Sequence, residues 1–269
     1  MDRKFFLGIG VAIVIIFFTA AFITHLPKGT AAGQDRDTLY QVSTIDALMQ
    51  GSFDGTEPVG ETLQHGDFGI GTFDGLDGEM IVLDGKMYQA RADGSVSPVA
   101  GSATTPFATV TFFDTDFAVT TGNRMNMSEL TSAIAPKLPS RNLIYAIQFH
   151  GTFPLMKVRA IPKQEPPYPT LTEAAKEQVV HVYNDTTGTV VGFYTPVLFD
   201  GINVPGYHLH YISDDRKEGG HILDMTVPSG TAVIFDLTDG FSMSLPTNGT
   251  FAGVDLSKDL SADLAKVER

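Results

Sequence analysis

The chain lacks cysteine and is short of positive charge: its 269 residues hold 18 Lys and Arg against 31 Asp and Glu, a formal net charge of −13. Without cysteine there is no disulfide, no thiolate zinc site and no thiol nucleophile, so any transition metal must be held by nitrogen and oxygen ligands. The basic residues are scattered along the sequence. We therefore expect no nucleic-acid partner, because such partners require a concentrated positive surface.

The N-terminal segment has the features of an export signal. Arg3 and Lys4 precede residues 5–24, which contain no charged side chain. A positive start followed by such a run is typical of a secretory signal or a membrane anchor. Small residues at 30–32 offer a cleavage site. We expect residues 1–32 to be a signal peptide or a signal anchor with its tether. The rest of the chain is expected to be extracytoplasmic, secreted or held at the membrane through residues 5–24.

The remainder of the sequence predicts a strand-rich α+β protein. Hydrophobic residues make up 43% and charged residues 18%, a globular composition. Apolar segments separated by turn residues predict mixed or antiparallel sheets in two closely packed subdomains, with a few short helices. We expect an N-terminal sheet subdomain over residues 33–160, a proline-rich connection at 161–169, and a C-terminal metal-binding β subdomain with a terminal helix over 170–269.

Several elements are expected from local signals. These are a strand over residues 109–119, a capped helix from Asn126 and Glu129 to Ile134, a capped helix from Thr170 and Glu173 to about Tyr183, and a terminal helix marked by Leu256, Leu260 and Leu264.

Three histidines form the most informative pattern. His208 and His210 are two residues apart, so on a strand they project from one face. The segment 211–220 reads as a hairpin turn that would bring His221 to the same face. Three neutral imidazoles make an open three-ligand zinc site of the catalytic kind. Two alternatives stay open at this point: each histidine is simply a half-buried polar side chain, or the site is cupin-like, since cupins also use paired histidines on strands.

Three longer motifs extend the pattern. They are GTFDGLDGEMIVLDGKMYQ at residues 71–89, YAIQFHGTFPLMKVRAIPKQEPPYPTL at 145–171 and GYHLHYISDDRKEGGHILD at 206–224. In this order they resemble the motifs of the α-acetolactate decarboxylases, and the resemblance extends over most of residues 37–245.

The resemblance implies a carboxy-lyase that converts 2-acetolactate to (R)-acetoin and carbon dioxide, in acetoin biosynthesis on the butanediol pathway. It implies one zinc ion per chain, or another divalent ion, that acts as electron sink on the substrate ketone and hydroxyl. By the same resemblance His208, His210 and His221 are the metal ligands, and the protein is a homodimer.

Three further residues match the family's catalytic positions: Glu79, Arg159 and, across a one-residue gap in a diverged C-terminus, Glu268. Read without the resemblance, Glu79 is a solvated turn carboxylate and Arg159 a surface ion-pair residue. Two other functions remain as alternatives, a cupin-like metal isomerase, oxygenase or hydrolase, and a non-catalytic secreted protein that binds a metal or a ligand.

Overall fold

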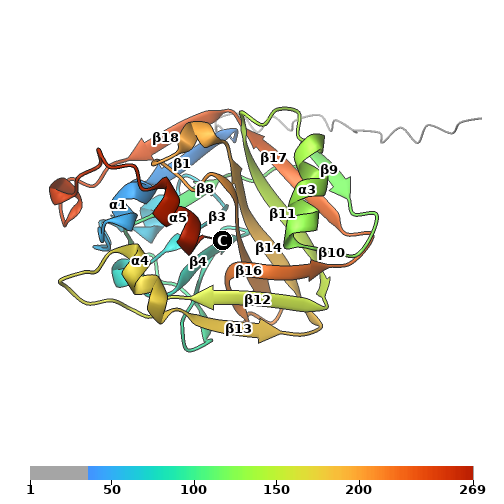
Figure 1. Cartoon of the computed structure of the whole chain (residues 1–269), viewed down its shortest axis with the longest axis horizontal. Helices are drawn as coiled ribbons and strands as arrows, with labels where there is room; N and C mark the ends of the chain where they lie inside the picture. Colours follow the sequence, from blue (N-terminus) through green and yellow to red (C-terminus); the bar gives the residue numbers. More distant parts are fainter. Residues whose placement is uncertain (1–35, 269) are drawn as a thin grey trace, which may run out of the picture.

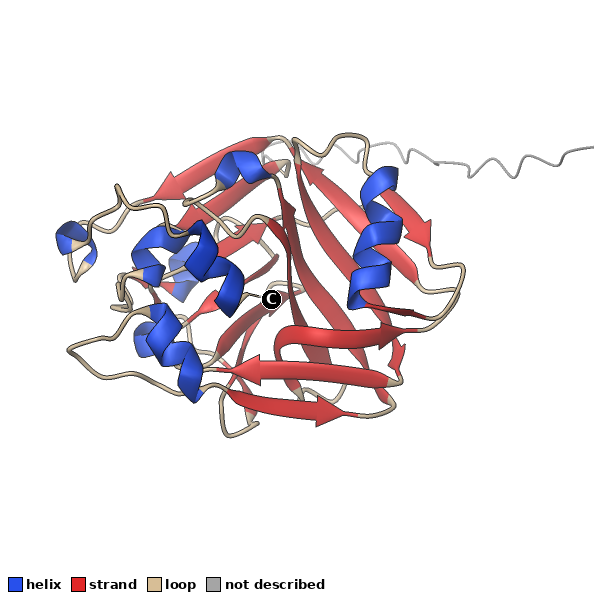
Figure 2. Cartoon of the chain, in the orientation of Figure 1, coloured by secondary structure: helices blue, strands red, loops and turns tan. Residues whose placement is uncertain are grey.

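The structure, a computed structural model, describes residues 36–268. The expected signal or anchor at residues 1–32 lies outside this part. Two large sheets and several short helices build the described chain (Figure 1, Figure 2). The expected strand-rich α+β class is confirmed. No helix within residues 36–268 is both long and apolar enough to cross a membrane.

The first sheet has seven strands, in which only the neighbours β18 and β1 run parallel. In spatial order they are β18 (Gly240–Ser244), β1 (Thr38–Val42), β8 (Ala108–Thr111), β3 (Phe68–Thr72), β4 (Glu79–Leu83), β5 (Lys86–Ala90) and β6 (Val96–Pro98).

The second sheet has nine strands and is antiparallel throughout. Its order is β13 (Val179–Tyr183), β12 (Leu155–Ala160), β16 (Gly219–Val227), β15 (Gly206–Ser213), β14 (Thr186–Thr195), β11 (Ile144–Phe153), β17 (Ala232–Thr238) and β9 (Phe117–Thr120), with β10 (Met125–Asn126) paired to β16. A third sheet is formed by β2 (Glu57–Pro58) and β7 (Thr104–Thr105).

The helices are short. They are α1 (Ile45–Met49), α2 (Val59–Thr62), α3 (Met127–Ile134), α4 (Leu171–Ala174) and α5 (Ser261–Val267). The expected capping box of α3 is confirmed, because Asn126 accepts from the Glu129 backbone and Glu129 accepts from the Asn126 backbone, both at 2.9 Å.

The two large sheets pack face to face through an apolar core. Phe68 and Ile81 of the first sheet meet Phe193 and Ile212 of the second in one buried cluster. The rings of Phe68 and Phe193 lie 5.9 Å apart, edge to face. The other side of the second sheet is covered by α3, which lies in front of β11 and β17 in Figure 1. This packing holds β4 against β15 and β16, where the functional side chains lie.

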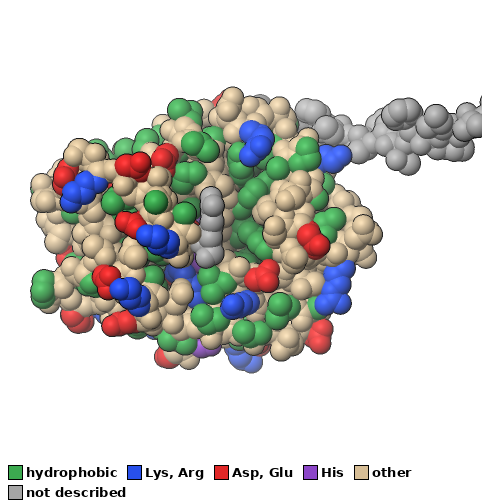
Figure 3. Space-filling view, viewed as in Figure 1, with side chains coloured by type: hydrophobic (Ala, Val, Ile, Leu, Met, Phe, Trp, Pro, Cys, Tyr) green, Lys and Arg blue, Asp and Glu red, His purple; other side chains and the backbone are tan. Residues whose placement is uncertain are grey.

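The helices α1, α4 and α5 gather beside the two sheets and share a third apolar cluster, to which they contribute Leu48, Leu171 and Leu264. The chain ends among them, near the centre of Figure 1. On this face acidic and basic side chains lie interspersed (Figure 3). These three helices therefore cover the side of the sheets that is drawn toward the viewer on the left of Figure 1, and the C-terminal residues pack among them.

The expected single strand over residues 109–119 is wrong. It is two strands, β8 in the first sheet and β9 in the second. The backbone N–H of Phe113 donates to the Asp67 carboxylate at 2.8 Å instead of joining a ladder, so the chain leaves one sheet there and enters the other. Each sheet also contains strands from both sides of the connection at residues 161–169. The strands β11 and β12 precede it but lie in the second sheet, and β18 follows it but lies in the first. Arg159 therefore belongs to the second sheet, and the two sheets do not follow the expected division of the sequence.

The expected helices at both ends of the C-terminal part are too long. The α4 segment ends within two turns, and Val179–Tyr183 forms the edge strand β13 instead. Its three valines favour a strand, because β-branched side chains lose rotamer freedom in a helix. The terminal helix begins only at Ser261, since Asp259 binds the backbone N–H of Ser261 at 3.1 Å and holds a turn there.

Replacing Phe193 by alanine tests the contact between the sheets. Phe193 is 1% exposed, so the Phe193→Ala variant is expected to lose about 3–5 kcal/mol of unfolding free energy through the cavity it leaves. Urea denaturation followed by circular dichroism measures the loss. Leu256→Ala is the control, because Leu256 is 42% exposed and its loss should stay within about 0.5 kcal/mol. Equal losses in the two variants would contradict a core at this contact.

Candidate active site

The three histidines lie together on the face of the second sheet that is turned toward β4. His208 and His210 alternate along β15, and His221 on β16 is directly opposite His210. The three rings have centroids 5.0–5.4 Å apart. One nitrogen from each residue can be chosen so that all three lie within 4.8 Å of one another. The spacing and hairpin expected from the sequence are therefore present.

The protonation of these imidazoles suits metal binding. The Nδ1–H of His210 donates to the carbonyl oxygen of Met80 on β4 at 2.8 Å, which leaves the lone pair on Nε2. That Nε2 and both nitrogens of His221 have no hydrogen-bond partner among residues 36–268. Burial lowers the pKa of His208 to about 3 and holds the pKa values of His210 and His221 well below the usual range. The result is three buried, neutral imidazoles, and no other described group uses the free nitrogens of His210 and His221.

Arg159 extends this row of side chains to the next strand. It lies on β12 directly opposite His221, beyond a register shift between Lys157 and Val158. Gly220 allows the two strands to approach, since its φ is +146° and a Cβ there would lie 2.8 Å from the Arg159 carbonyl oxygen. Arg159 is 4% exposed, and its guanidinium carries a permanent charge. It therefore needs carboxylate partners within the protein.

Glu79 supplies the first partner from the opposite sheet. It opens β4 directly after Gly78, whose φ of +80° and contact with the Ala90 carbonyl leave no room for a side chain. One Glu79 oxygen pairs with Arg159, and the other lies 3.6 Å from Nε2 of His210. Burial raises the pKa of Glu79 to about 7, although Arg159 offsets part of this rise. Glu79 is thus a buried carboxyl beside both the arginine and the metal-ligand candidates, not a solvated turn residue.

Glu268 supplies the second partner from the end of the chain. It follows α5, which is anchored by the buried side chains of Leu264 and Val267. Its Oε1 lies 3.4 Å from Nη2 of Arg159, and its Oε2 lies 3.4 Å from Nε2 of His208. Burial raises the pKa of Glu268, and the charge of Arg159 acts in the other direction. The structure therefore brings all six residues expected from the sequence into one cluster.

The charges of this cluster fit a bound divalent cation. With both carboxyls ionised, Glu79 and Glu268 carry two negative charges against the one positive charge of Arg159, while the histidines are neutral. Oε2 of Glu268 has no hydrogen-bond partner among the described residues. Three nitrogen donors with a nearby carboxylate are a donor set for zinc or a similar transition metal. We conclude that His208, His210 and His221 could hold such an ion.

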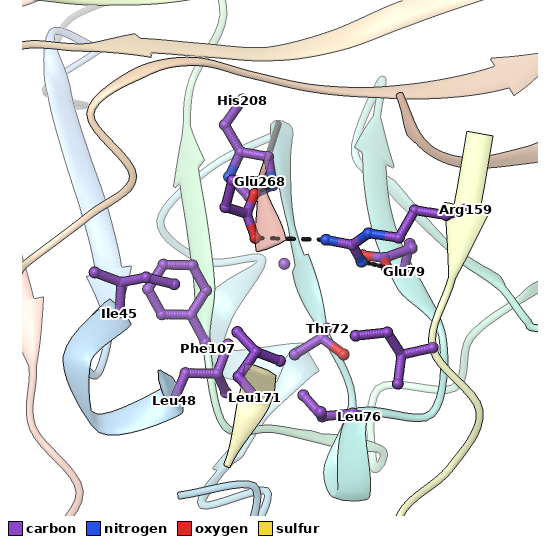
Figure 4. A pocket seen from close by; sticks show the side chains of 12 residues that line it. Ile45, Leu48, Thr72, Leu76, Glu79, Phe107, Arg159, Leu171, His208 and Glu268 are labelled. Atoms are coloured by element: carbon purple, nitrogen blue, oxygen red, sulfur yellow. Dashed lines mark hydrogen bonds and ion pairs between the residues drawn. The ribbon is translucent and has the colours of Figure 1, made fainter. Parts of the chain in front are cut away.

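A cavity lies against this cluster (Figure 4). Its empty space of about 420 Å³ includes open solvent, so the enclosed part is much smaller and admits only a small ligand. Glu79, Arg159, His208 and Glu268 line its polar side. Its apolar wall is formed by Ile45, Leu48, Leu76, Phe107, Ile161 and Leu171. The sequence did not predict this wall, because apolar residues in short helices and loops carry no mark that separates cavity lining from ordinary core.

The other described histidines take no part in the site. The ring of His65 stacks on Tyr40 with centroids 3.8 Å apart. His150 is exposed and lies 3.1 Å from Asp214. His181 lies on the edge strand β13, in a segment that the sequence predicted to be helical, and contacts the Ala92 carbonyl oxygen at 3.0 Å. These side chains are surface or packing residues.

Comparisons with known proteins agree with this geometry. A family model described as alpha-acetolactate decarboxylase matches residues 39–258. The chain is 49% identical to the alpha-acetolactate decarboxylase of Methanosarcina mazei over 87% of this chain and 81% of that protein. It is 39% identical to the enzyme of the same name from Methylococcus capsulatus, over 93% of this chain and 97% of that protein.

A solved structure is similar to the whole described fold. The crystal structure of alpha-acetolactate decarboxylase from Bacillus subtilis strain 168 superposes with a TM-score of 0.82 at 37% identity. The match covers 86% of this chain and 98% of that one. The similarity therefore includes both sheets, not only the histidine hairpin.

Removing one imidazole tests the metal centre. His210→Ala is expected to weaken zinc binding by at least about 10–100-fold, the loss seen when even an outer partner of a metal ligand is removed. Metal content after dialysis, measured by inductively coupled plasma mass spectrometry, reports the change. His150→Ala is the matched control, because this histidine is exposed and outside the cluster. Full zinc occupancy in His210→Ala would exclude His210 as a ligand.

Proposed function

Since the chain belongs to the alpha-acetolactate decarboxylase family, we propose that it converts 2-acetolactate to (R)-acetoin and carbon dioxide with a zinc ion held by His208, His210 and His221. Its relatives make it a lyase of the decarboxylase type. One observation supports the proposed substrate and metal: Glu79, Arg159 and Glu268 converge on the three histidines beside one cavity.

The reaction sets clear demands on the site. The bond between the carboxylate and the hydroxyl-bearing carbon breaks, and its electron pair moves into the adjacent ketone to give an enediolate. A proton must then reach the carbon that lost carbon dioxide, so each turnover consumes one proton. When bound, the zinc ion would act as a Lewis acid that stabilises negative charge on the ketone and hydroxyl oxygens. Neutral imidazole ligands leave the charge of the ion undiminished, unlike thiolates.

We assign the binding of the substrate carboxylate to Arg159. Its guanidinium keeps its charge at any working pH and has a planar arrangement of donors that suits a carboxylate. The pairs with Glu79 and Glu268 hold this group at the cavity, and its Nε–H has no partner among the described residues. Arg159 also counters the repulsion that an acidic protein exerts on an anionic substrate.

We assign the delivery of the proton to Glu79. One of its oxygens is fixed by Arg159 and the other faces His210, so the carboxyl lies between the carboxylate-binding group and the metal ligands. A carboxyl held in this way is positioned for general acid catalysis and can favour one face of the enediolate. Glu268, on the other side of the same guanidinium, positions Arg159 and adds an oxygen beside His208. The apolar wall of the cavity suits the two methyl groups of the substrate.

The direct test is an assay of acetoin formation. The purified protein, loaded with zinc, is incubated with racemic 2-acetolactate, and the product is separated by chiral gas chromatography. Acetoin above the slow spontaneous background, with an excess of the (R) form, is expected. A zinc-loaded protein that produces no more acetoin than the background would refute the proposed reaction.

The proton-transfer role predicts the behaviour of Glu79→Gln. This variant keeps the size and polarity of the side chain but cannot supply the proton, so turnover should fall by about 10²–10⁴-fold while zinc content is unchanged. Steady-state kinetics and metal analysis on one preparation measure both quantities. Glu61→Gln, at an exposed glutamate, is the control and should match the parent protein. Undiminished turnover in Glu79→Gln would remove this residue from the mechanism.

We also propose that the enzyme acts outside the cytoplasm and as a homodimer. Arg3, Lys4 and the uncharged residues 5–24 are the basis for export or tethering. Fractionation of producing cells, together with N-terminal sequencing, tests the location and the cleavage.

Analytical ultracentrifugation tests the dimer, and a single monomeric species would contradict it.

A further inference from the structure

A second cluster of possible metal ligands lies away from the active site. Asp37, Asp114 and Asp236 each offer one carboxylate oxygen, and these three oxygens lie within 4.8 Å of one another. All the donors are oxygen, in contrast to the nitrogen donors of the histidine centre. Carboxylates on a protein surface often gather without a ligand, so the case depends on how these groups are buried and partnered.

Asp236 is fully buried, with 0% of its surface exposed. Neither of its oxygens accepts a hydrogen bond of normal geometry from residues 36–268, and the same holds for Oδ1 of Asp114. A buried carboxylate without hydrogen bonds is costly, and native proteins rarely retain one without a reason. Burial raises the pKa of Asp236 to about 8, with repulsion from Asp114 and Asp116 adding to the effect.

Few described cations lie near Asp114 and Asp236. Nε of Arg36 lies 3.5 Å from Oδ2 of Asp114, but the same guanidinium also donates to the Phe113 carbonyl at 2.8 Å and lies 3.8 Å from Asp67. No ion pair to Asp236 is formed within the described chain. Asp114 therefore shares one partly exposed arginine with Asp67, and Asp116 lies close to Asp236. Around Asp114 and Asp236 the carboxyls outnumber the described cations, and a bound cation could balance their charge.

The position of the cluster gives such a cation a structural role. Asp114 lies in the connection from β8 of the first sheet to β9 of the second. Asp236 lies on β17, just before the chain returns to the first sheet as β18, and it is paired with Ala146 of the core between the sheets. The carbonyl of Asp37, at the start of β1, accepts from Gly240 of β18 at 2.9 Å. The three carboxylates thus lie beside the two segments, β8 to β9 and β17 to β18, in which the described chain passes from one sheet to the other.

The geometry points to a binding site for a hard divalent cation, calcium, held by Asp37, Asp114 and Asp236, that cross-links the two sheets where the chain passes between them. Carboxylate oxygens are the ligands of calcium and magnesium, whereas zinc favours nitrogen and sulfur donors. Calcium suits an irregular set of carboxylates better than magnesium, which demands near-ideal octahedral geometry and gives up its waters reluctantly. This site is distinct from the histidine centre in its residues, its donor atoms and its place in the fold.

The rival state is a cluster that holds a proton in place of a metal, with Asp236 as a neutral acid. The two states differ in their response to calcium. A specific site binds one calcium ion per chain and stabilises the fold, because an ion that binds only the folded state shifts the unfolding equilibrium. A protonated cluster responds to calcium no more than to an equal ionic strength of potassium chloride.

The experiment uses the full-length chain, saturated with zinc so that the histidine centre is already filled. Thermal unfolding is followed as calcium chloride is added, with potassium chloride at matched ionic strength as reference. A rise in melting temperature of roughly 3–10 °C is expected when calcium is about 10–100 times its dissociation constant. Equilibrium dialysis should find one calcium ion per chain. No bound calcium, or an equal rise with potassium chloride, overturns the proposal.

Asp236→Asn removes the central carboxylate with little change of shape, and it should abolish the calcium-dependent rise. Asp185→Asn is the matched control, because Asp185 is exposed in the β13–β14 turn and its left-handed backbone, with φ of +51°, is tolerated by asparagine. This control should keep the full rise. If Asp236→Asn does not fold, Asp114→Asn replaces it and should shift the rise to higher calcium. A variant of the cluster that responds like Asp185→Asn overturns the assignment.

Discussion

The arrangement of the active site depends on one buried guanidinium. Arg159 comes from β12 of the second sheet, Glu79 from β4 of the first, and Glu268 from the end of the chain. A buried arginine without partners, or two buried carboxylates without the arginine, would each carry a large desolvation cost. The three groups are therefore stable only together, and their pairing fixes two sheets and a terminal helix around the histidines. Burying these charges contributes little to the free energy of folding, so the cluster is better explained by a catalytic role.

The fold meets this demand by placing the charged groups at the open side of an apolar sandwich. Phe68 and Phe193 hold the sheets together, and glycines at 78 and 220 let the backbone approach closely on either side of the site. The Met80 carbonyl then fixes the tautomer of His210 across the sheets. Rigid strands, rather than loops, thus carry the proposed metal ligands and the proposed proton donor. Such placement suits a reaction in which the position of one proton determines the product.

An acidic protein without cysteine separates its two candidate metal centres by donor chemistry. Imidazole nitrogens at the active site suit zinc and related transition metals, whereas the carboxylates of Asp37, Asp114 and Asp236 suit a harder ion. Burial shapes both centres, since it keeps the histidines neutral and leaves Asp236 without solvent and without a hydrogen bond of normal geometry from residues 36–268. The first centre would serve the reaction, and the second would hold the crossings between the sheets on which the geometry of the first depends.

The sequence alone determined the histidine face, because a spacing of two on a strand and a hairpin turn are local rules that act over a few residues. It pointed to Glu79 and Arg159 only through long motifs shared with a family, since nothing in their own surroundings marks them as buried partners. The division of residues 109–119 between two sheets was decided by tertiary structure. So were the position of Glu268 beside His208 and the gathering of three aspartates, because these contacts join segments far apart in the chain. Their proximity arises from the packing of the sheets, which no local pattern encodes.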